Sequence, residues 1–289
     1  MKIKKNIILA EPRGFCAGVK SSLKAVEKAL KDFGPPIYVK HEIVHNKSVL
    51  KDLSRKGVVF AENIYDIPEG STFVISAHGV SPDVQGKAKE KRFKIVDATC
   101  PVVKKIHKMA SELSGRGYKT ILIGHKNHPE IIGITGYIGG EYHTVEKRGD
   151  LKKVSFGKSD RIAIITQTTL NFDDTIELID EIKEKFPGVE PRSNSNICYA
   201  TRDRQDAVRR ISEKADLVLI IGSANSSNSN RLRETALKKC PKSFLIENKD
   251  EVTDKMLSGA LTIGISAGAS APEYLVEELI EMLKSKGYE

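Results

Sequence analysis

Alternating strand-like and helix-like segments predict a protein of the α/β class. Short runs rich in Val and Ile recur along the 289 residues, separated by segments whose apolar residues return at helical spacing. Such alternation favours mostly parallel sheets covered by helices on both faces. In addition, three of the four cysteines each precede a helix-like segment and are followed by polar clusters at similar distances. Together these features predict an α/β fold built from three similar parts.

The predicted strands follow one another along the whole chain. They are the apolar runs at 6–10, 37–39, 58–60, 73–76, 94–96, 120–124, 142–145, 162–166, 217–222, 243–246 and 261–265. Helices are predicted between them, most clearly over 19–30 and 102–113, where apolar residues recur every three or four positions. The segment 187–196 is rich in Pro, Ser and Asn, which predicts a linker into the last part of the chain.

Three cysteines mark a repeat. From Cys16, Cys100 and Cys198, a first polar site follows after 29, 28 and 29 residues, at His45, His128 and Ser227. A second follows after 62, 68 and 72 residues, at His78, Thr168 and Ser270. We therefore predict three similar α/β domains, residues 1–96, 97–191 and 192–289, the last of which also carries a C-terminal helix. Because ligands bind at the carboxyl ends of parallel strands, we expect the three thiols to face a common centre.

Composition and charge narrow the class of partner. The formal net charge is +9, from 47 basic and 38 acidic residues, which suits a polyanion, a small anionic substrate or an acidic protein. Aromatic residues make up 6%, Trp is absent and no nucleic-acid motif is visible, so we expect no nucleic-acid partner. No apolar run could span a membrane and no targeting signal is visible. We therefore expect a cytoplasmic chain with reduced cysteines and no membrane partner.

Cys16, Cys100 and Cys198 are candidate metal ligands, because a helix N-terminus stabilises the negative charge of a thiolate. The alternative is that each is a small buried apolar side chain, but packing alone gives no reason for the repetition. Zinc sites usually take paired cysteines from a C-x-x-C motif, and the sequence contains none. Three distant thiolates are better suited to an iron–sulfur cluster, where three ligands on four irons leave one iron open to substrate. Cys240, which lies among lysines, has no counterpart in the other repeats, and we expect a free thiol there.

The polar clusters are suited to an anion. Histidines stand in VHN (44–46), SAHG (76–79) and GHKNHPE (124–130), while hydroxyls and amides stand in NSSNSNR (225–231) and SAGASAP (266–272). The last two segments precede predicted helices, where backbone N–H groups, Ser and Asn form phosphate sites. The alternative is ordinary helix capping, by Ser270 with Glu273 and by Asn228 or Asn230. Two such segments beside three histidines favour a phosphate.

Glu130 is the one carboxylate in the strand-end clusters. It follows His-Pro at a predicted helix start, where the helix dipole alone would favour a carboxylate. In a dry pocket the same group is the obvious proton donor. Thr168, the hydroxyl in TQTTL (166–170), could relay that proton or orient a substrate hydroxyl.

Taken in order, these motifs resemble the IspH/LytB family of 4-hydroxy-3-methylbut-2-enyl diphosphate reductases. The matching segments are PRGFCAG, VHN, SAHGV, DATCP, GHKNHPE, TQTTL, ICYAT, NSSNSNR and SAGASAP, and the likeness runs from Ile7 to about Leu283. The resemblance implies a pseudo-threefold trefoil of three α/β domains around a central iron–sulfur cluster. It also implies an oxidoreductase of the last step of the non-mevalonate isoprenoid pathway. That reaction removes the allylic hydroxyl of its substrate with two electrons and two protons, giving isopentenyl and dimethylallyl diphosphate.

The resemblance also implies roles for individual residues. Cys16, Cys100 and Cys198 match the ligands of a 4Fe-4S cluster with one open iron, or of a 3Fe-4S form after loss of iron. Glu130 matches the proton donor, with Thr168 and His128 as the other catalytic positions. The substrate-binding positions are His45, His78, His128, Thr168, Ser226, Ser227, Asn228 and Ser270. The implied partners are the small-molecule diphosphate and an acidic electron donor, a ferredoxin or flavodoxin, which the positive charge would steer.

Two other functions stay open at this stage. A non-catalytic iron–sulfur or redox-sensing protein would hold a cluster without converting the diphosphate, and turnover with reduced viologen separates it from a reductase. A nucleic-acid-binding module would use the basic surface instead, with salt-dependent retention on a DNA or RNA column.

Overall fold

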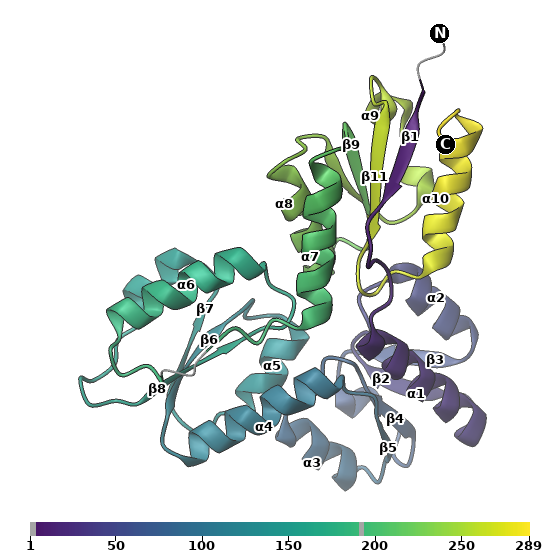
Figure 1. Cartoon of the computed structure of the whole chain (residues 1–289). Coiled ribbons are helices and arrows are strands. Elements are labelled where there is room, and N and C mark those ends of the chain that lie inside the picture. The colour runs from purple at the N-terminus through teal and green to yellow at the C-terminus, as the bar shows by residue number, and fades with distance from the viewer. Residues whose placement is uncertain (1–3, 191–193) are drawn as a thin grey trace. The chain divides into compact units, whose positions relative to one another are not determined.

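The computed structural model of the chain describes residues 4–190 and 194–289. In these residues, eleven strands form three sheets with helices between them, which confirms the predicted α/β class (Figure 1). The chain divides into two compact units. Unit 1 comprises Met1–Val19, Val44–Asp52 and Tyr199–Glu289, and unit 2 comprises Lys20–Ile43 and Leu53–Cys198.

Unit 1 is built on one four-stranded sheet in which every pairing is parallel. In spatial order its strands are β1 (Asn6–Leu9), β11 (Thr262–Ala267), β9 (Leu217–Ile221) and β10 (Ser243–Ile246). The helices of this part of the chain are α7 (Tyr199–Ser212), α8 (Ser227–Leu237), η3 (Lys249–Glu251), α9 (Asp254–Leu257) and α10 (Glu273–Ser285).

Side chains of the buried strand β9 point alternately to the two faces of this sheet. Leu217 and Leu219 pack in one apolar cluster with residues of α10. Val218 and Ile220 pack in another, with residues of α7 and α8. Figure 1 shows α10 on one side of the sheet and α7 with α8 on the other. A central strand buried on both faces explains why β9 is apolar at every position.

Unit 2 contains two further parallel sheets. The first has the order β3 (Val58–Ala61), β2 (Ile37–Lys40), β4 (Thr72–Ile75), β5 (Lys94–Asp97), and the second has β7 (Tyr142–Val145), β6 (Lys119–Ile123), β8 (Ile162–Thr166). Its helical segments are η1 (Ile64–Asp66), α3 (Pro82–Glu90), α4 (Pro101–Gly115), α5 (Pro129–Thr135), η2 (Arg148–Lys153) and α6 (Phe172–Lys185). Two helices begin in unit 1 and end in unit 2, namely α1 (Ala17–Phe33) and α2 (Lys47–Arg55).

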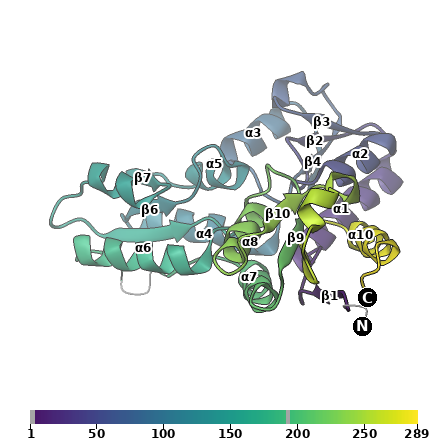
Figure 2. The same ribbon diagram turned by 90° about the horizontal axis from the view of Figure 1, so that it is seen from above.

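The second sheet of unit 2 is also covered on both faces. Ile121 and Ile123 of β6 pack in a cluster with α6, whereas Leu122 packs with residues of α4 and α5. The two views agree that α6 and α5 lie on opposite sides of this sheet (Figures 1 and 2). The apolar burial fixes the register, so that the loops after β6 and β8 leave the same edge of the sheet.

Each of the eleven predicted strands overlaps an observed one, and 142–145, 162–166 and 243–246 have the observed bounds. Both predicted helices extend a few residues further, as α1 and α4. In the predicted linker, 187–190 and 194–196 carry no helix or named strand, and 191–193 lie outside the described residues. The division into three domains, the trefoil and the central cluster stay predictions. Within the described residues, no helix is both long and apolar enough to cross a membrane.

Candidate active site

Three segments of unit 2 place predicted site residues directly after parallel strands. His78 follows β4, His128 and Glu130 follow β6, and Thr168 follows β8. Strands β6 and β8 are neighbours, so their carboxyl ends deliver the last three residues to one edge of the sheet. Gln167 joins the two loops, because its Oε1 accepts the N–H of His125 at 3.0 Å.

Thr168 holds both oxygens of the Glu130 carboxyl. The Thr168 backbone N–H donates to Oε1 at 2.7 Å, and the Thr168 hydroxyl lies 2.8 Å from Oε2. Glu130 is only 2% exposed, so this acid is held away from water at the first turn of α5. A buried carboxyl fixed through two contacts with one residue has a defined direction in which it can pass a proton.

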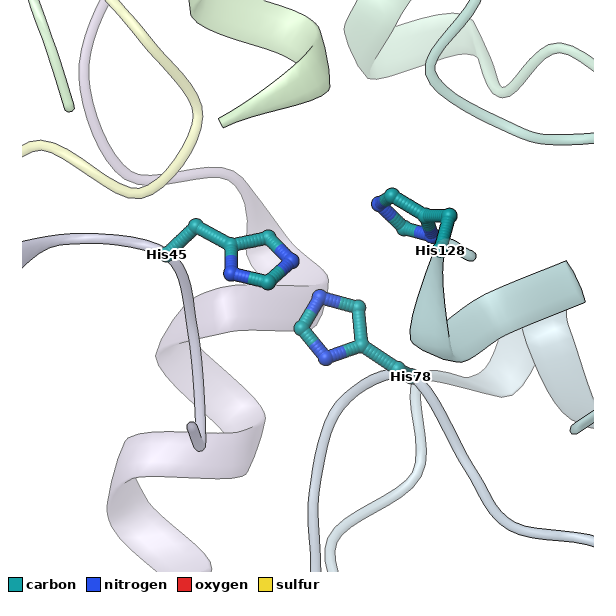
Figure 3. Close-up of side chains that lie close together, drawn as sticks. All are labelled: His45, His78 and His128. Carbon is teal, nitrogen blue, oxygen red and sulfur yellow. The ribbon is translucent and has the colours of Figure 1, made fainter. Parts of the chain in front are cut away.

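His128 is the N-cap of α5, and its Nδ1 accepts the Glu130 N–H at 3.2 Å. The neutral ring therefore carries its hydrogen on Nε2, where it can donate to an anionic oxygen. The His78 and His128 rings lie edge to face with centroids 5.5 Å apart. Figure 3 shows this pair and also labels His45, which belongs to unit 1. Unit 2 thus joins His78, His128, Glu130 and Thr168 in one chain of contacts.

Two of the candidate thiols join the same chain of contacts through their backbones. The Cys100 N–H donates to the Ala77 carbonyl at 3.0 Å, next to His78, and the Cys198 N–H donates to the Thr168 carbonyl at 3.2 Å. The segment before Cys198 is held by two further bonds, from the Thr166 N–H to Asn196 Oδ1 and from the Asn196 N–H to Thr166 Oγ1.

In unit 1, the loop after β11 ties Cys16 to His45. The Cys16 N–H donates to the Ala269 carbonyl at 3.2 Å, and the Ser270 hydroxyl donates to the His45 carbonyl at 2.8 Å. Gly14 sits at φ +62, a conformation that favours glycine, and turns the chain towards Cys16. The structure therefore brings Cys16, His45 and Ser270 together within this unit.

The NSSNSNR segment of unit 1 begins α8. Ser226 is the N-cap, with Ser227 and Asn228 in the first turn. Asn228 is 4% exposed, and neither Oδ1 nor Nδ2 of its amide has a hydrogen-bond partner among the described residues. A buried amide without a partner costs free energy, which a bound polar ligand would recover.

The capping alternative is wrong for each residue that it named, because a different serine caps α8. Ser226 Oγ caps α8 by accepting the Ser229 N–H at 3.3 Å, so neither Asn228 nor Asn230 is the cap. Helix α10 begins after Pro272 without a side-chain cap, so Ser270 does not cap it. Asn228 and Ser270 are thus not accounted for by capping.

The thiols fit a cluster-binding role in their chemistry. Cys16, Cys100 and Cys198 form no disulfide and are half-buried, and each stands directly before a helix, namely α1, α4 and α7. Cys16 Sγ already accepts the Val19 N–H at 3.4 Å, as a thiolate at a helix start would. Cys240 is buried instead, with Sγ 3.6 Å from the Lys242 carbonyl, which supports the prediction that it is not a ligand.

Three buried polar residues near these segments were not predicted from the sequence. Arg204 donates from Nη2 and Nε to the Gly14 carbonyl, at 2.7 and 3.1 Å, and so braces the loop that carries Cys16. Ser229 contacts Ser226. His107 stacks on Tyr137 with centroids 4.3 Å apart. Arg204 and His107 lie on the buried stripes of α7 and α4, where a polar residue is itself a signal that the sequence offered.

His107 packs against the backbone next to two site residues. A Cβ added to Gly79, which follows His78, would lie 2.5 Å from His107 Cε1. A Cβ on Gly133, one turn after Glu130, would lie 3.4 Å from Nε2. Burial lowers the pKa of His107 to about 4, against a smaller opposing effect of the Asp97 carboxylate. The ring is therefore neutral at physiological pH.

Comparison with known proteins gives one consistent result. The LytB protein family model matches residues 7–284. A 4-hydroxy-3-methylbut-2-enyl diphosphate reductase of Polaromonas sp. is 45% identical over 97% of this chain and 84% of its own length. The same enzyme of Shewanella pealeana is 45% identical over 96% of this chain and 91% of its own length.

Solved structures give the same result. An E-1-hydroxy-2-methyl-but-2-enyl-4-diphosphate reductase of Plasmodium falciparum superposes with a TM-score of 0.93 at 37% identity, covering 97% of this chain and 88% of that one. A second, described as the terminal enzyme of the non-mevalonate pathway, gives a TM-score of 0.69 at 34% identity, covering 97% and 99%.

These proteins form one class, reductases that act on an allylic diphosphate. The chain belongs to the LytB family, whose members are iron–sulfur enzymes of the terminal step of the non-mevalonate isoprenoid pathway.

Proposed function

We propose that the chain reductively dehydroxylates (E)-4-hydroxy-3-methylbut-2-enyl diphosphate to isopentenyl and dimethylallyl diphosphate, with Glu130 as the proton donor. The observation that carries this proposal is the buried Glu130 carboxyl, held through both oxygens by Thr168. Hydroxide is a poor leaving group from carbon, and a positioned acid converts it into water.

Proton delivery follows from the two contacts. A protonated Glu130 would donate to Thr168 Oγ1, which lies 2.8 Å from Oε2 and can pass its own hydrogen to the substrate hydroxyl. The Thr168 N–H stays on Oε1 throughout and keeps the carboxyl from turning away. His128 leaves its Nε2 hydrogen for the substrate, because Nδ1 is occupied by the Glu130 N–H.

Cys16, Cys100 and Cys198 are the residues that would hold a 4Fe-4S cluster. The support is their shared position at helix starts and the absence of a disulfide on any of them. When bound, the cluster supplies electrons one at a time and an open iron with Lewis-acid character. Cys240 would remain free.

The residues proposed to bind the diphosphate are histidine, hydroxyl and amide donors. In unit 1, the support is the partnerless amide of buried Asn228, at the start of a helix whose backbone N–H groups attract anions. In unit 2, it is the Nε2 hydrogen of His128. The full proposed set is His45, His78, His128, Thr168, Ser226, Ser227, Asn228 and Ser270.

The electron donor would be an acidic protein such as a ferredoxin or flavodoxin. The support is the formal net charge of +9, which would steer an acidic partner towards the chain. Reduction by such a donor should slow as ionic strength rises, whereas reduction by a small neutral donor should not.

Replacing Glu130 tests the proposal. Glu130→Gln keeps the size and some hydrogen bonding but cannot donate the acid proton. It should fold, take up its cluster and bind inorganic diphosphate as the wild type does, while turnover falls by roughly 10²–10⁴-fold. Glu130→Asp keeps an acid with a shorter reach, and its turnover should lie between the two.

Asp83→Asn is the matched control, because Asp83 is an exposed first-turn carboxylate of α3 in the same unit. It should retain wild-type turnover. If the turnover of Glu130→Gln also lay within threefold of that of the wild type at equal cluster content, Glu130 would be only a helix-start carboxylate. Its proposed role as proton donor would then be wrong.

A further inference from the structure

We infer that Ser229 is a positioning residue for the substrate diphosphate, because it fixes the direction of the Ser226 hydroxyl. The inference rests on the proposed function, in which Ser226 binds the diphosphate. Ser229 itself would not touch the substrate. It lies in the first turn of α8 and is fully buried, at 0% exposure.

Ser226 Oγ lies within reach of two hydrogens from Ser229. The Ser229 N–H approaches it at 3.3 Å and the Ser229 hydroxyl at 3.0 Å. A serine oxygen has two acceptor positions, and these two contacts fill both. The Ser226 hydrogen must then point away from Ser229, towards whatever lies at the helix start.

The direction of the hydroxyl–hydroxyl bond follows from burial. Ser226 Oγ is the one hydrogen-bond partner of Ser229 Oγ among the described residues. If Ser226 donated instead, the Ser229 hydrogen would be buried without an acceptor, which costs free energy. Ser229 is therefore the donor, and the Ser226 hydrogen is left for a bound anion.

Two glycines leave room for this arrangement. Gly222 and Gly268 follow directly after β9 and β11, the central strands of the unit 1 sheet. A Cβ at Gly222 would lie 2.2 Å from Ser229 Oγ, and a Cβ at Gly268 would lie 2.1 Å from it. A larger residue at either position would displace the Ser229 hydroxyl, so the two glycines leave the space that this hydroxyl occupies.

The test is a double-mutant cycle on the cluster-loaded protein with Ser226→Ala, Ser229→Ala and both together. Calorimetry would give the dissociation constant of inorganic diphosphate for each variant, and kinetics would give KM and kcat for the substrate. Ser226→Ala should weaken diphosphate binding about tenfold or more, and Ser229→Ala about 2- to 10-fold. In the Ser226→Ala background, Ser229→Ala should have no further effect, because it acts through Ser226.

The kinetic parameters should distinguish a positioning role of Ser229 from a general disruption of the site. Ser229→Ala should raise KM by a similar factor, with kcat within about twofold of the wild type, because binding is weakened equally before and during the reaction. Ser212→Ala is the matched control, since Ser212 is a buried serine of α7 in the same unit whose hydroxyl bonds only the Val208 carbonyl. Ser212→Ala should leave the dissociation constant of inorganic diphosphate unchanged.

Other outcomes would show whether the proposed role of Ser226 or only the inference about Ser229 is wrong. If Ser226→Ala leaves diphosphate binding intact, the proposed role of Ser226 fails, and the inference about Ser229 fails with it. If Ser226→Ala weakens binding but Ser229→Ala does not, only the inference is overturned. An equal loss in both backgrounds would also overturn it, because Ser229 would then act independently of Ser226. Gly268→Ala, which displaces the hydroxyl with Ser229 still present, should reproduce Ser229→Ala if that variant folds poorly.

Discussion

The Thr168 side chain gives the first prediction at the level of single residues. Thr168→Val removes the hydroxyl 2.8 Å from Glu130 Oε2 but keeps the backbone N–H on Oε1. We expect turnover to fall about tenfold or more, because the variant lacks the hydroxyl that passes the proton from Glu130 to the substrate. Thr168→Ser should retain most of the activity. Equal turnover of the Val and Ser variants would show that the hydroxyl plays no part.

His107 gives a prediction about pH. Its pKa is lowered to about 4 in the folded chain, whereas an exposed histidine titrates near 6.5. Between these values the unfolded chain binds a proton that the folded chain does not, so the free energy of unfolding falls as the pH falls from about 6.5 to 4. One such group contributes a slope of at most about 1.4 kcal/mol per pH unit.

His107→Gln removes this titration while keeping a neutral polar side chain of similar length. Urea unfolding of both proteins at several pH values between 4 and 7 measures the difference. The variant should lose less stability than the wild type as the pH falls. Asp97 and Tyr137 border the ring and are unchanged in both proteins, so parallel curves would mean that His107 titrates normally.

The site residues that could be predicted from the sequence share a local signal. The contacts that could not be predicted arise only when distant parts of the chain come together. Glu130 and Thr168 stand directly after apolar strands, so their position relative to the sheet was visible in the sequence. Ser229 was hidden, because its role depends on Gly222 and Gly268, whose closeness to it arises only when β9 and β11 pair. Arg204 offers a signal as a polar residue on the buried stripe of α7, but its acceptor, Gly14, lies 190 residues away in the chain and could not be predicted.

At the level of secondary-structure elements, the strands were easier to predict than the helix ends. Strands such as β8 and β9 are buried at every position and stand out as unbroken apolar runs. Helix starts depend on a single hydrogen bond, and NSSNSNR offers several residues able to cap. The selection of Ser226 over Asn228 follows from the turn that the folded chain makes after β9.

The three helices that begin after a cysteine carry the next prediction. Replacing Cys16, Cys100 or Cys198 by Ser removes one proposed ligand at the start of α1, α4 or α7. Each variant, purified anaerobically, should lose the broad visible absorption of an iron–sulfur cluster and its activity. Iron and sulfide content, measured chemically, provides a readout that does not depend on turnover.

Cys240→Ser is the matched control for these variants, since it also removes one thiol from the chain. It should keep the visible spectrum, the iron content and the activity. A Cys240→Ser protein that lost its colour, next to a Cys198→Ser protein that kept it, would contradict the ligand assignment.

At the scale of the whole molecule, the chain passes repeatedly between its two units. Residues 20–43 belong to unit 2 and 44–52 to unit 1, so His45 and His78 fall in different units. Spacing along the sequence identified the polar clusters. It does not show which unit each cluster belongs to, because the division into units depends on which strands pair. Strand β1 illustrates the point, since it pairs with β11 from the other end of the chain.

The most direct test is turnover by the whole, cluster-loaded chain. Anaerobic protein would be mixed with reduced viologen and (E)-4-hydroxy-3-methylbut-2-enyl diphosphate, and electrons consumed and products formed would be counted together. We predict two electrons per substrate, with isopentenyl and dimethylallyl diphosphate as the products. A protein that holds its full cluster and binds the diphosphate, yet consumes no electrons and forms neither product, would contradict the proposed reaction and favour a redox-sensing role.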